Sequence, residues 1–129
     1  MFTLLDKLPR PLWVGLSWLG VGMVLMLSLL PLTVPEQLEF WNADKLVHMT
    51  MYASLMLSFS RAYARRRWLA IAIALGSLGL GIEYLQSLTP DRSASLLDET
   101  ANLAGISIML LLLRRRAPDT VASSSAGQP

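Results

Sequence analysis

Charged and amide side chains occur at the ends of runs that are otherwise apolar. Glu83 and Gln86 close an apolar run in the segment "GLGIEYLQSLTPDR". Asp44, Lys45 and His48 open another such run in "ADKLVHMTMY". Carboxylates and an imidazole can exchange protons, and a lysine can bind a phosphate. These residue types therefore predict a site that handles a polar, charged ligand.

Each candidate residue has a role that its chemistry suggests. His48 is the leading general acid or base, because imidazole exchanges protons near neutral pH, and Glu83 or Asp98 would orient it. Lys45 and Arg92 are the candidate phosphate ligands, Arg92 with a two-pronged guanidinium. The other residues predicted to bind the substrate are Asp44, Tyr52, Gln86, Ser93 and Asn102.

The same residues have other readings. His48, Glu83 and Asp98 would offer a metal one nitrogen and two carboxylates, but no ligand spacing such as H-x-x-x-H is present, so we predict no metal site. No cofactor is indicated. Structural roles are the alternative: Asp44 as a helix cap, Lys45 extending to the membrane surface, and a capping pair formed by Asp98 with Ser95.

Composition indicates a membrane protein of one domain. Of 129 residues, 53% are hydrophobic and 16% charged, with a mean hydropathy of +0.48. Soluble proteins carry about 25% charged residues. The chain has no cysteine, which excludes disulfides. Its basic residues flank apolar runs, so nucleic acid is not a predicted partner.

Four apolar runs predict an all-α fold, an integral membrane bundle of four transmembrane helices. A helix needs about 20 residues to cross a bilayer. The predicted helices cover residues 12–31, 46–60, 68–88 and 95–113. Pro31 and Pro35 would end the first helix and Pro90 the third. A soluble helical bundle is the alternative, but the first and third runs would then be apolar on all faces.

The distribution of basic residues predicts that both termini lie in the cytoplasm, since lysine and arginine favour the cytoplasmic side. Four crossings from an inner N-terminus place nine of the eleven basic residues inside. These are Lys7, Arg10, Arg61, Arg65, Arg66, Arg67, Arg114, Arg115 and Arg116. Residues 1–116 would form the membrane domain and residues 117–129 a disordered cytoplasmic tail.

This topology brings the polar residues to one level of the outer leaflet. Asp44, His48 and Tyr52 recur every four residues and so share a helix face. Asp98 and Asn102 form a similar stripe, which Gly105 continues with room for close helix approach. Ionisable groups within spans face the bundle interior or a wet cavity. We therefore predict a shared pocket at the extracytoplasmic face.

With these residues in place, the chain resembles the VanZ-like family of small bacterial membrane proteins. The matching segments are "DKLVHMTMY", "EYLQ" and "DRSASLLDETANLAG", and the resemblance covers roughly residues 10–113. The order and spacing of these segments, rather than any one of them, carry it. Family members often have a second glycine four residues after Gly105, where this chain has Met109.

The resemblance implies a multi-pass protein of the bacterial cytoplasmic membrane. The family takes its name from a member linked to low-level resistance to teicoplanin, and it implies no settled activity. We expect the pocket to handle a lipid headgroup or an envelope precursor, with membrane lipids, anionic lipid or a cell-wall precursor as candidate partners. Whether it catalyses stays open. The alternative is a non-catalytic envelope protein that binds an antibiotic or lipid, or a structural membrane protein.

Overall fold

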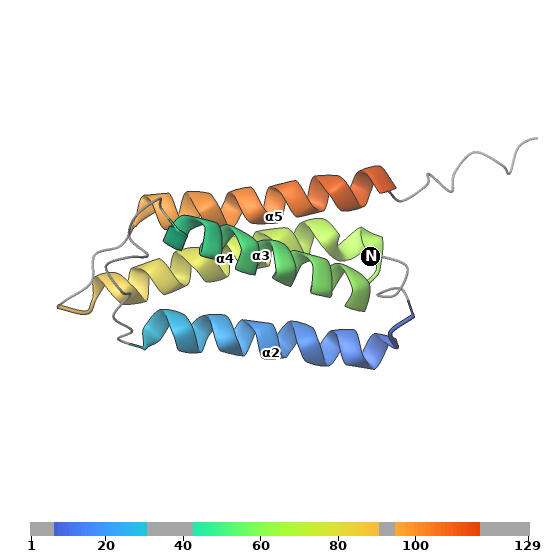
Figure 1. Cartoon of the computed structure of the whole chain (residues 1–129), viewed down its shortest axis with the longest axis horizontal. Coiled ribbons are helices and arrows are strands. Elements are labelled where there is room, and N and C mark those ends of the chain that lie inside the picture. Colours follow the sequence, from blue (N-terminus) through green and yellow to red (C-terminus); the bar gives the residue numbers. More distant parts are fainter. Residues whose placement is uncertain (1–6, 31–42, 91–94, 117–129) are drawn as a thin grey trace, which may run out of the picture.

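Four long α-helices make up the structure (Figure 1). The computed structural model describes residues 7–30, 43–90 and 95–116. Its helices are α2 (Arg10–Leu29), α3 (Ala43–Ala62), α4 (Trp68–Ser87) and α5 (Leu96–Arg116), and the short 3-10 helix η2 (Arg65–Arg67) leads into α4. The described residues contain no strand. The prediction of an all-α bundle is confirmed.

The predicted helix bounds are close to the observed ones. α2 begins two residues earlier than predicted, and Pro11 lies in its first turn, where a missing N–H costs nothing. α3 is longer than the predicted 46–60, because its polar ends are helical too. Pro31, Pro35 and the predicted disordered tail, residues 117–129, lie outside the described residues.

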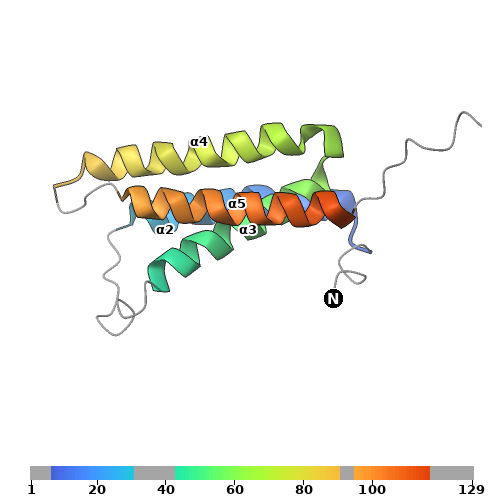
Figure 2. The same cartoon turned by 90° about the horizontal axis from the view of Figure 1, so that it is seen from above.

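Consecutive helices run in opposite directions (Figure 1). α3 makes its most extensive contact with α5, and it also packs against α2. Figure 2 shows α3 running obliquely to the other three helices. The bundle therefore has two ends of different character. We call the end with Ala43, Ser87 and Leu96 the polar end, and the end with Arg10, η2 and Arg116 the basic end.

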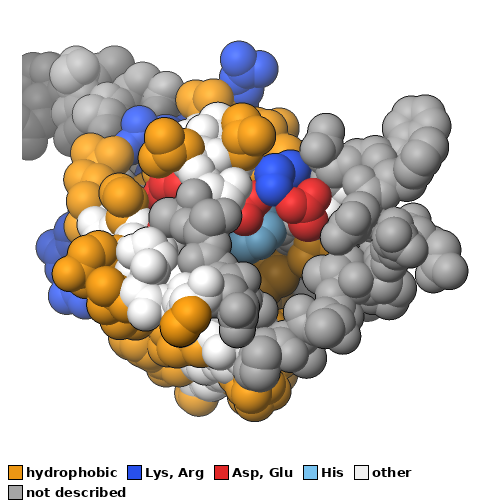
Figure 3. Space-filling view, turned by 90° about the vertical axis from the view of Figure 1, so that its left-hand side faces the viewer, with side chains coloured by type: hydrophobic (Ala, Val, Ile, Leu, Met, Phe, Trp, Pro, Cys, Tyr) orange, Lys and Arg blue, Asp and Glu red, His pale blue; other side chains and the backbone are white. Residues whose placement is uncertain are grey.

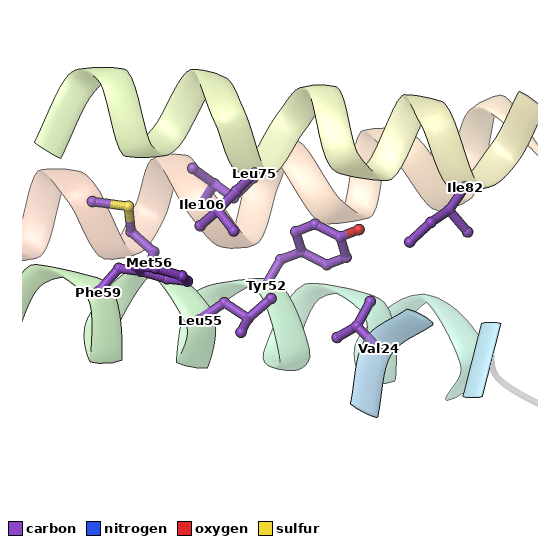
Figure 4. Close-up of a cluster of buried hydrophobic side chains, with 8 residues drawn as sticks. All are labelled: Val24, Tyr52, Leu55, Met56, Phe59, Leu75, Ile82 and Ile106. Carbon is purple, nitrogen blue, oxygen red and sulfur yellow. The ribbon is translucent and has the colours of Figure 1, made fainter. Parts of the chain in front are cut away.

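Apolar side chains from all four helices fill the centre of the bundle (Figure 4). Met56 is fully buried, and Tyr52 is only 2% exposed. The other members of this core are Val24, Leu55, Phe59, Leu75, Ile82 and Ile106. In Figure 4 the hydroxyl of Tyr52 points along the bundle toward the side where Ile82 lies. The apolar core therefore adjoins the polar end at the Tyr52 hydroxyl.

The outer surface of the bundle is also apolar. Leu19 is 62% exposed and Ile73 63% exposed. Among the described helices, α2, α5 and the segment 65–87 are long and apolar enough to cross a membrane. Lipid, rather than water, is the medium that suits such a surface. The protein is therefore a membrane protein.

α3 is less apolar than the other three helices, but its hydroxyl groups are hydrogen-bonded within the helix. Its hydroxyl groups donate to backbone carbonyls of the preceding turn: Thr50 to Leu46, at 2.7 Å, and Ser54 to Thr50, at 2.8 Å. A hydroxyl group that is hydrogen-bonded within its own helix adds little to the free-energy cost of placing that helix in lipid. α3 has the same 20-residue length as α2 and α4, but it is not among the helices apolar enough to cross by composition, so its crossing stays a prediction.

The sidedness of the bundle stays a prediction, and cysteine labelling tests it. The chain has no cysteine, so single cysteines give clean signals. We expect Ser93→Cys to react with an impermeant thiol reagent added to cells whose outer membrane has been permeabilised and whose cytoplasmic membrane is intact. Ala64→Cys, at the basic end, should react only after lysis. The reverse pattern would contradict the predicted orientation.

Candidate functional site

The backbones of α3 and α5 approach closely about two turns from the polar end. A methyl group at Gly105 of α5 would overlap the backbone carbonyl of Met49 in α3. Only glycine permits this approach. The predicted role of Gly105 is confirmed. The contact sets the positions of His48 and Asn102, the neighbours of this crossing point on the two helices.

Lys45 joins the beginnings of α3 and α5. Its ammonium group pairs with the Asp98 carboxylate of α5 and lies 2.5 Å from the Asp44 carboxylate. Lys45 and Asp98 are largely shielded, with side chains 24% and 18% exposed. Figure 3 shows basic, acidic and histidine side chains side by side at this end. Among the described residues, Lys45 therefore pairs with two carboxylates.

His48 lies directly beneath this ion pair. Its Nδ1 is 3.1 Å from Oδ1 of Asn102, and its Nε2 is 3.9 Å from Oδ2 of Asp98. Because the Asn102 oxygen can only accept, Nδ1 carries the proton and donates it. Nε2 is then the free, basic nitrogen. The Asp98 carboxylate lies beside this nitrogen.

The hydrogen-bond chain continues inward to a carboxylate that the sequence did not single out. Asn102 is 2% exposed and donates from Nδ2 to Oε2 of Glu99, at 3.1 Å. Glu99 is 6% exposed, and its other oxygen, Oε1, has no hydrogen-bond partner. Gly79 of α4 makes room for it, since a methyl group there would overlap the Glu99 carboxylate.

Glu83 approaches the same region from α4. It is 7% exposed, and its Oε2 accepts the backbone N–H of Ser95, at 2.7 Å. The Ser95 hydroxyl in turn accepts the N–H of Asp98, at 3.3 Å. In a capping box the third helical residue would accept the Ser95 N–H itself. Here Glu83 does so, which leaves Asp98 free to pair with Lys45.

Tyr52 connects the polar residues to the apolar core. Its ring is buried in the core, and it lies one helical turn beyond His48 on the same face of α3. The polar end thus brings together six predicted residues from three helices. They are Asp44, Lys45, His48, Glu83, Asp98 and Asn102.

The charge of this cluster is mainly negative. Its described carboxylates are Asp44, Glu83, Asp98 and Glu99, against one lysine and one histidine. The carboxylates of Glu83 and Glu99 are the two that are buried. Carboxylate oxygens away from water favour hydrogen-bond donors and positive charge. The inner part of the cluster therefore suits a ligand with hydroxyl or amino groups.

Three predicted ligand residues are not placed in this cluster. Gln86 donates to the backbone carbonyl of Ser28, at 2.7 Å, and so links α4 to α2. This contact is a hydrogen bond between two helices, which is a structural role. Arg92 and Ser93 lie outside the described residues. Their roles as ligands stay predictions.

The described residues contain no group of three histidine, aspartate or glutamate side chains arranged to hold a metal ion. The alternative metal set of His48, Glu83 and Asp98 does not form such a group. His48 and Asp98 face each other, whereas Glu83 caps Ser95.

The sequence contains a pattern that places Glu99 on a buried helix face, but this spacing alone does not distinguish Glu99 from Asp98. Glu99, Asn102 and Ile106 follow a three–four spacing, which places them on one helix face, and all three are buried. Gly79, four residues before Glu83, is the matching signal on α4, because it opens the face that receives Glu99. Asp98 and Asn102 form an equally regular stripe, so the spacing could not show whether Asp98 or Glu99 faces the interior.

Comparison with known proteins adds no relative: the chain matches no protein-family model, no curated protein and no solved structure. Its function must therefore be inferred from the site itself.

Proposed function

We propose that the chain is a VanZ-like membrane protein of the bacterial cell envelope whose polar end binds the headgroup of a lipid or lipid-linked envelope precursor. Support comes mainly from one observation, the buried Glu99 carboxylate whose Oε1 has no hydrogen-bond partner. A buried acceptor without a donor is costly, and a ligand that supplies the donor removes the cost.

The arrangement suits a headgroup with two kinds of group. Lys45 can bind a phosphate by exchanging one of its two carboxylate partners, and Arg92 is the candidate second cation. The hydroxyl or amino groups of the same headgroup would donate to Glu99 and Glu83. A phosphorylated lipid that carries a sugar or amine satisfies both requirements. The cytoplasmic membrane, with the polar end facing outward, is the proposed location.

His48 gives this site the option of chemistry. Asn102 holds Nδ1, so Nε2 is the nitrogen available to a bound headgroup. As a base it would take a proton from a hydroxyl, and Asp98 would stabilise the resulting charge. Non-catalytic binding is the alternative, and it uses Lys45 without needing His48. The family resemblance adds glycopeptide resistance as a further proposal, through the envelope precursors that such antibiotics bind.

Lipid capture by variants of Lys45 and His48 tests the proposal. Purified protein in detergent micelles is mixed with a polyprenyl phosphate, phosphatidylethanolamine and phosphatidylglycerol, and bound lipids are counted by native mass spectrometry. We expect Lys45→Ala to lower capture of the preferred lipid about tenfold, as for loss of a charged hydrogen bond. His48→Ala should leave capture intact and abolish any slow chemical change in the bound lipid.

Thr100→Val is the matched control. Thr100 follows Glu99 but is exposed, and its hydroxyl bonds within α5 to Leu96. It should capture lipid like the wild type. If Lys45→Ala also captures all three lipids like the wild type, the polar end does not bind headgroups. If the lipid stays chemically unchanged with the wild type, binding without catalysis is the remaining function.

A further inference from the structure

A groove runs along the outside of the bundle near its basic end, between α2 and α4. Its volume is about 580 Å³, a size that accommodates small organic ligands. Ala70 and Ala74, one turn apart on α4, are small and exposed, and they leave this space open. Apart from Arg67 and the Tyr63 ring, the lining is apolar, which suits a hydrocarbon chain.

Aromatic rings form one wall of the groove. Trp18 meets Phe59 edge-on, with ring centroids 5.6 Å apart, and Phe59 stacks on Tyr63 at 6.0 Å. Phe59 is buried, whereas Trp18 is 59% exposed. Such paired rings hold one another in fixed positions. The wall is therefore preformed, and an occupant need not order it.

Positive charge surrounds one end of this groove. Arg67 lines it, is exposed, and makes no ion pair within the described ranges. The backbone N–H of Trp68 already donates to the carbonyl of Arg65, and the exposed Arg65 and Arg66 add positive charge beside Arg67. All acidic residues that the structure describes lie at the opposite, polar end. An apolar groove with this mouth matches a molecule with a long chain and an anionic head.

We infer that this groove binds an anionic phospholipid, with one acyl chain between α2 and α4 and the phosphate on Arg67. The inference is independent of the proposed function, because it concerns the other end of the bundle. A second copy of the chain fits less well, since a copy with the same orientation would bring its own basic end to the same level. A neutral lipid would leave the Arg67 charge unused.

A second hollow provides the contrast. It lies between α2 and α3, has a volume of about 360 Å³, and has no charged residue in its lining. Any lipid can cover such a surface. Selectivity for anionic lipid is therefore the property that distinguishes the groove at Arg67, and it is the property to measure.

Native mass spectrometry of the full chain measures this selectivity. The protein in detergent micelles is mixed with equal amounts of phosphatidylglycerol and phosphatidylcholine that carry identical acyl chains. We expect the wild type to prefer phosphatidylglycerol, and Arg67→Gln to lower its binding about fivefold without changing phosphatidylcholine, as for loss of one cation near the membrane surface. Ala74→Leu fills the groove and should lower the binding of both lipids.

Two control variants separate this site from general effects. Ser77→Leu adds the same bulk to an exposed position of α4 outside the groove, and Arg115→Gln removes a charge from α5 at the same end. Both should bind lipid like the wild type, and circular dichroism should show equal helicity in all variants. The inference is overturned if Arg67→Gln keeps the wild-type lipid ratio, or if Arg115→Gln lowers it equally.

Discussion

Gly105→Ala is expected to force α3 and α5 apart and to lower the free energy of unfolding by about 2 to 3 kcal/mol. The added methyl group would overlap the backbone carbonyl of Met49. A flexible side chain can rotate away from such a group, but a helical backbone cannot. The two helices can accept the methyl only by separating, and this loosens the most extensive helix contact in the bundle.

The matched control for this variant is Gly81→Ala. Gly81 lies in α4, and a methyl group there has no atom within 4 Å. It should leave stability unchanged or raise it slightly, because alanine is the better helix former. Unfolding of both variants by a denaturing detergent, followed by circular dichroism, gives the comparison. Equal stability of the two would mean that α3 and α5 do not approach this closely.

The same separation should disturb the polar end. His48 precedes Met49 by one residue, and Asn102 precedes Gly105 by one helical turn. The 3.1 Å contact between His48 and Asn102 therefore depends on the glycine. A variant that moves the helices apart by about the width of a methyl group stretches this hydrogen bond beyond its useful range. Lipid capture should fall together with stability, because Lys45 of α3 and Asp98 of α5 would move apart as well.

Much of this architecture follows from the sequence. Apolar runs of about 20 residues can only be helices in a bilayer, and Pro11 in the first turn fits the start of α2. Alternation of direction then brings the ends with Lys45, Glu83 and Asp98 together. These steps need only helix geometry and chain connectivity.

Which side chains contact each other within the cluster could not be predicted in the same way. Adjacent helical residues point about 100° apart, so either Asp98 or Glu99 could face the interior. In the structure Lys45 pairs with Asp98 at the rim, and Glu99 packs against Gly79. Gln86 shares a stripe with Glu83 but reaches Ser28 of α2. Crossing angles and close contacts depend on packing across all four helices.

Glu99→Gln is expected to keep or raise stability, by up to about 1 kcal/mol, while lowering lipid capture about tenfold. The amide has the same shape, and its oxygen can still accept the hydrogen bond from Asn102. It removes a buried carboxylate that has one oxygen without a hydrogen-bond donor. Functional sites often keep such unfavourable groups at a cost in stability.

Asp98→Asn, the neighbouring substitution, is the informative control. It removes the carboxylate that pairs with Lys45, so it should lower stability by about 1 kcal/mol, a modest loss because both side chains are partly exposed. The two substitutions at adjacent acidic residues are thus expected to change the free energy of unfolding in opposite directions. If Glu99→Gln is the more destabilising of the two, the Glu99 carboxylate is structural. If it is stable and captures lipid normally, the headgroup does not reach Glu99, and Lys45 at the rim would bind it alone.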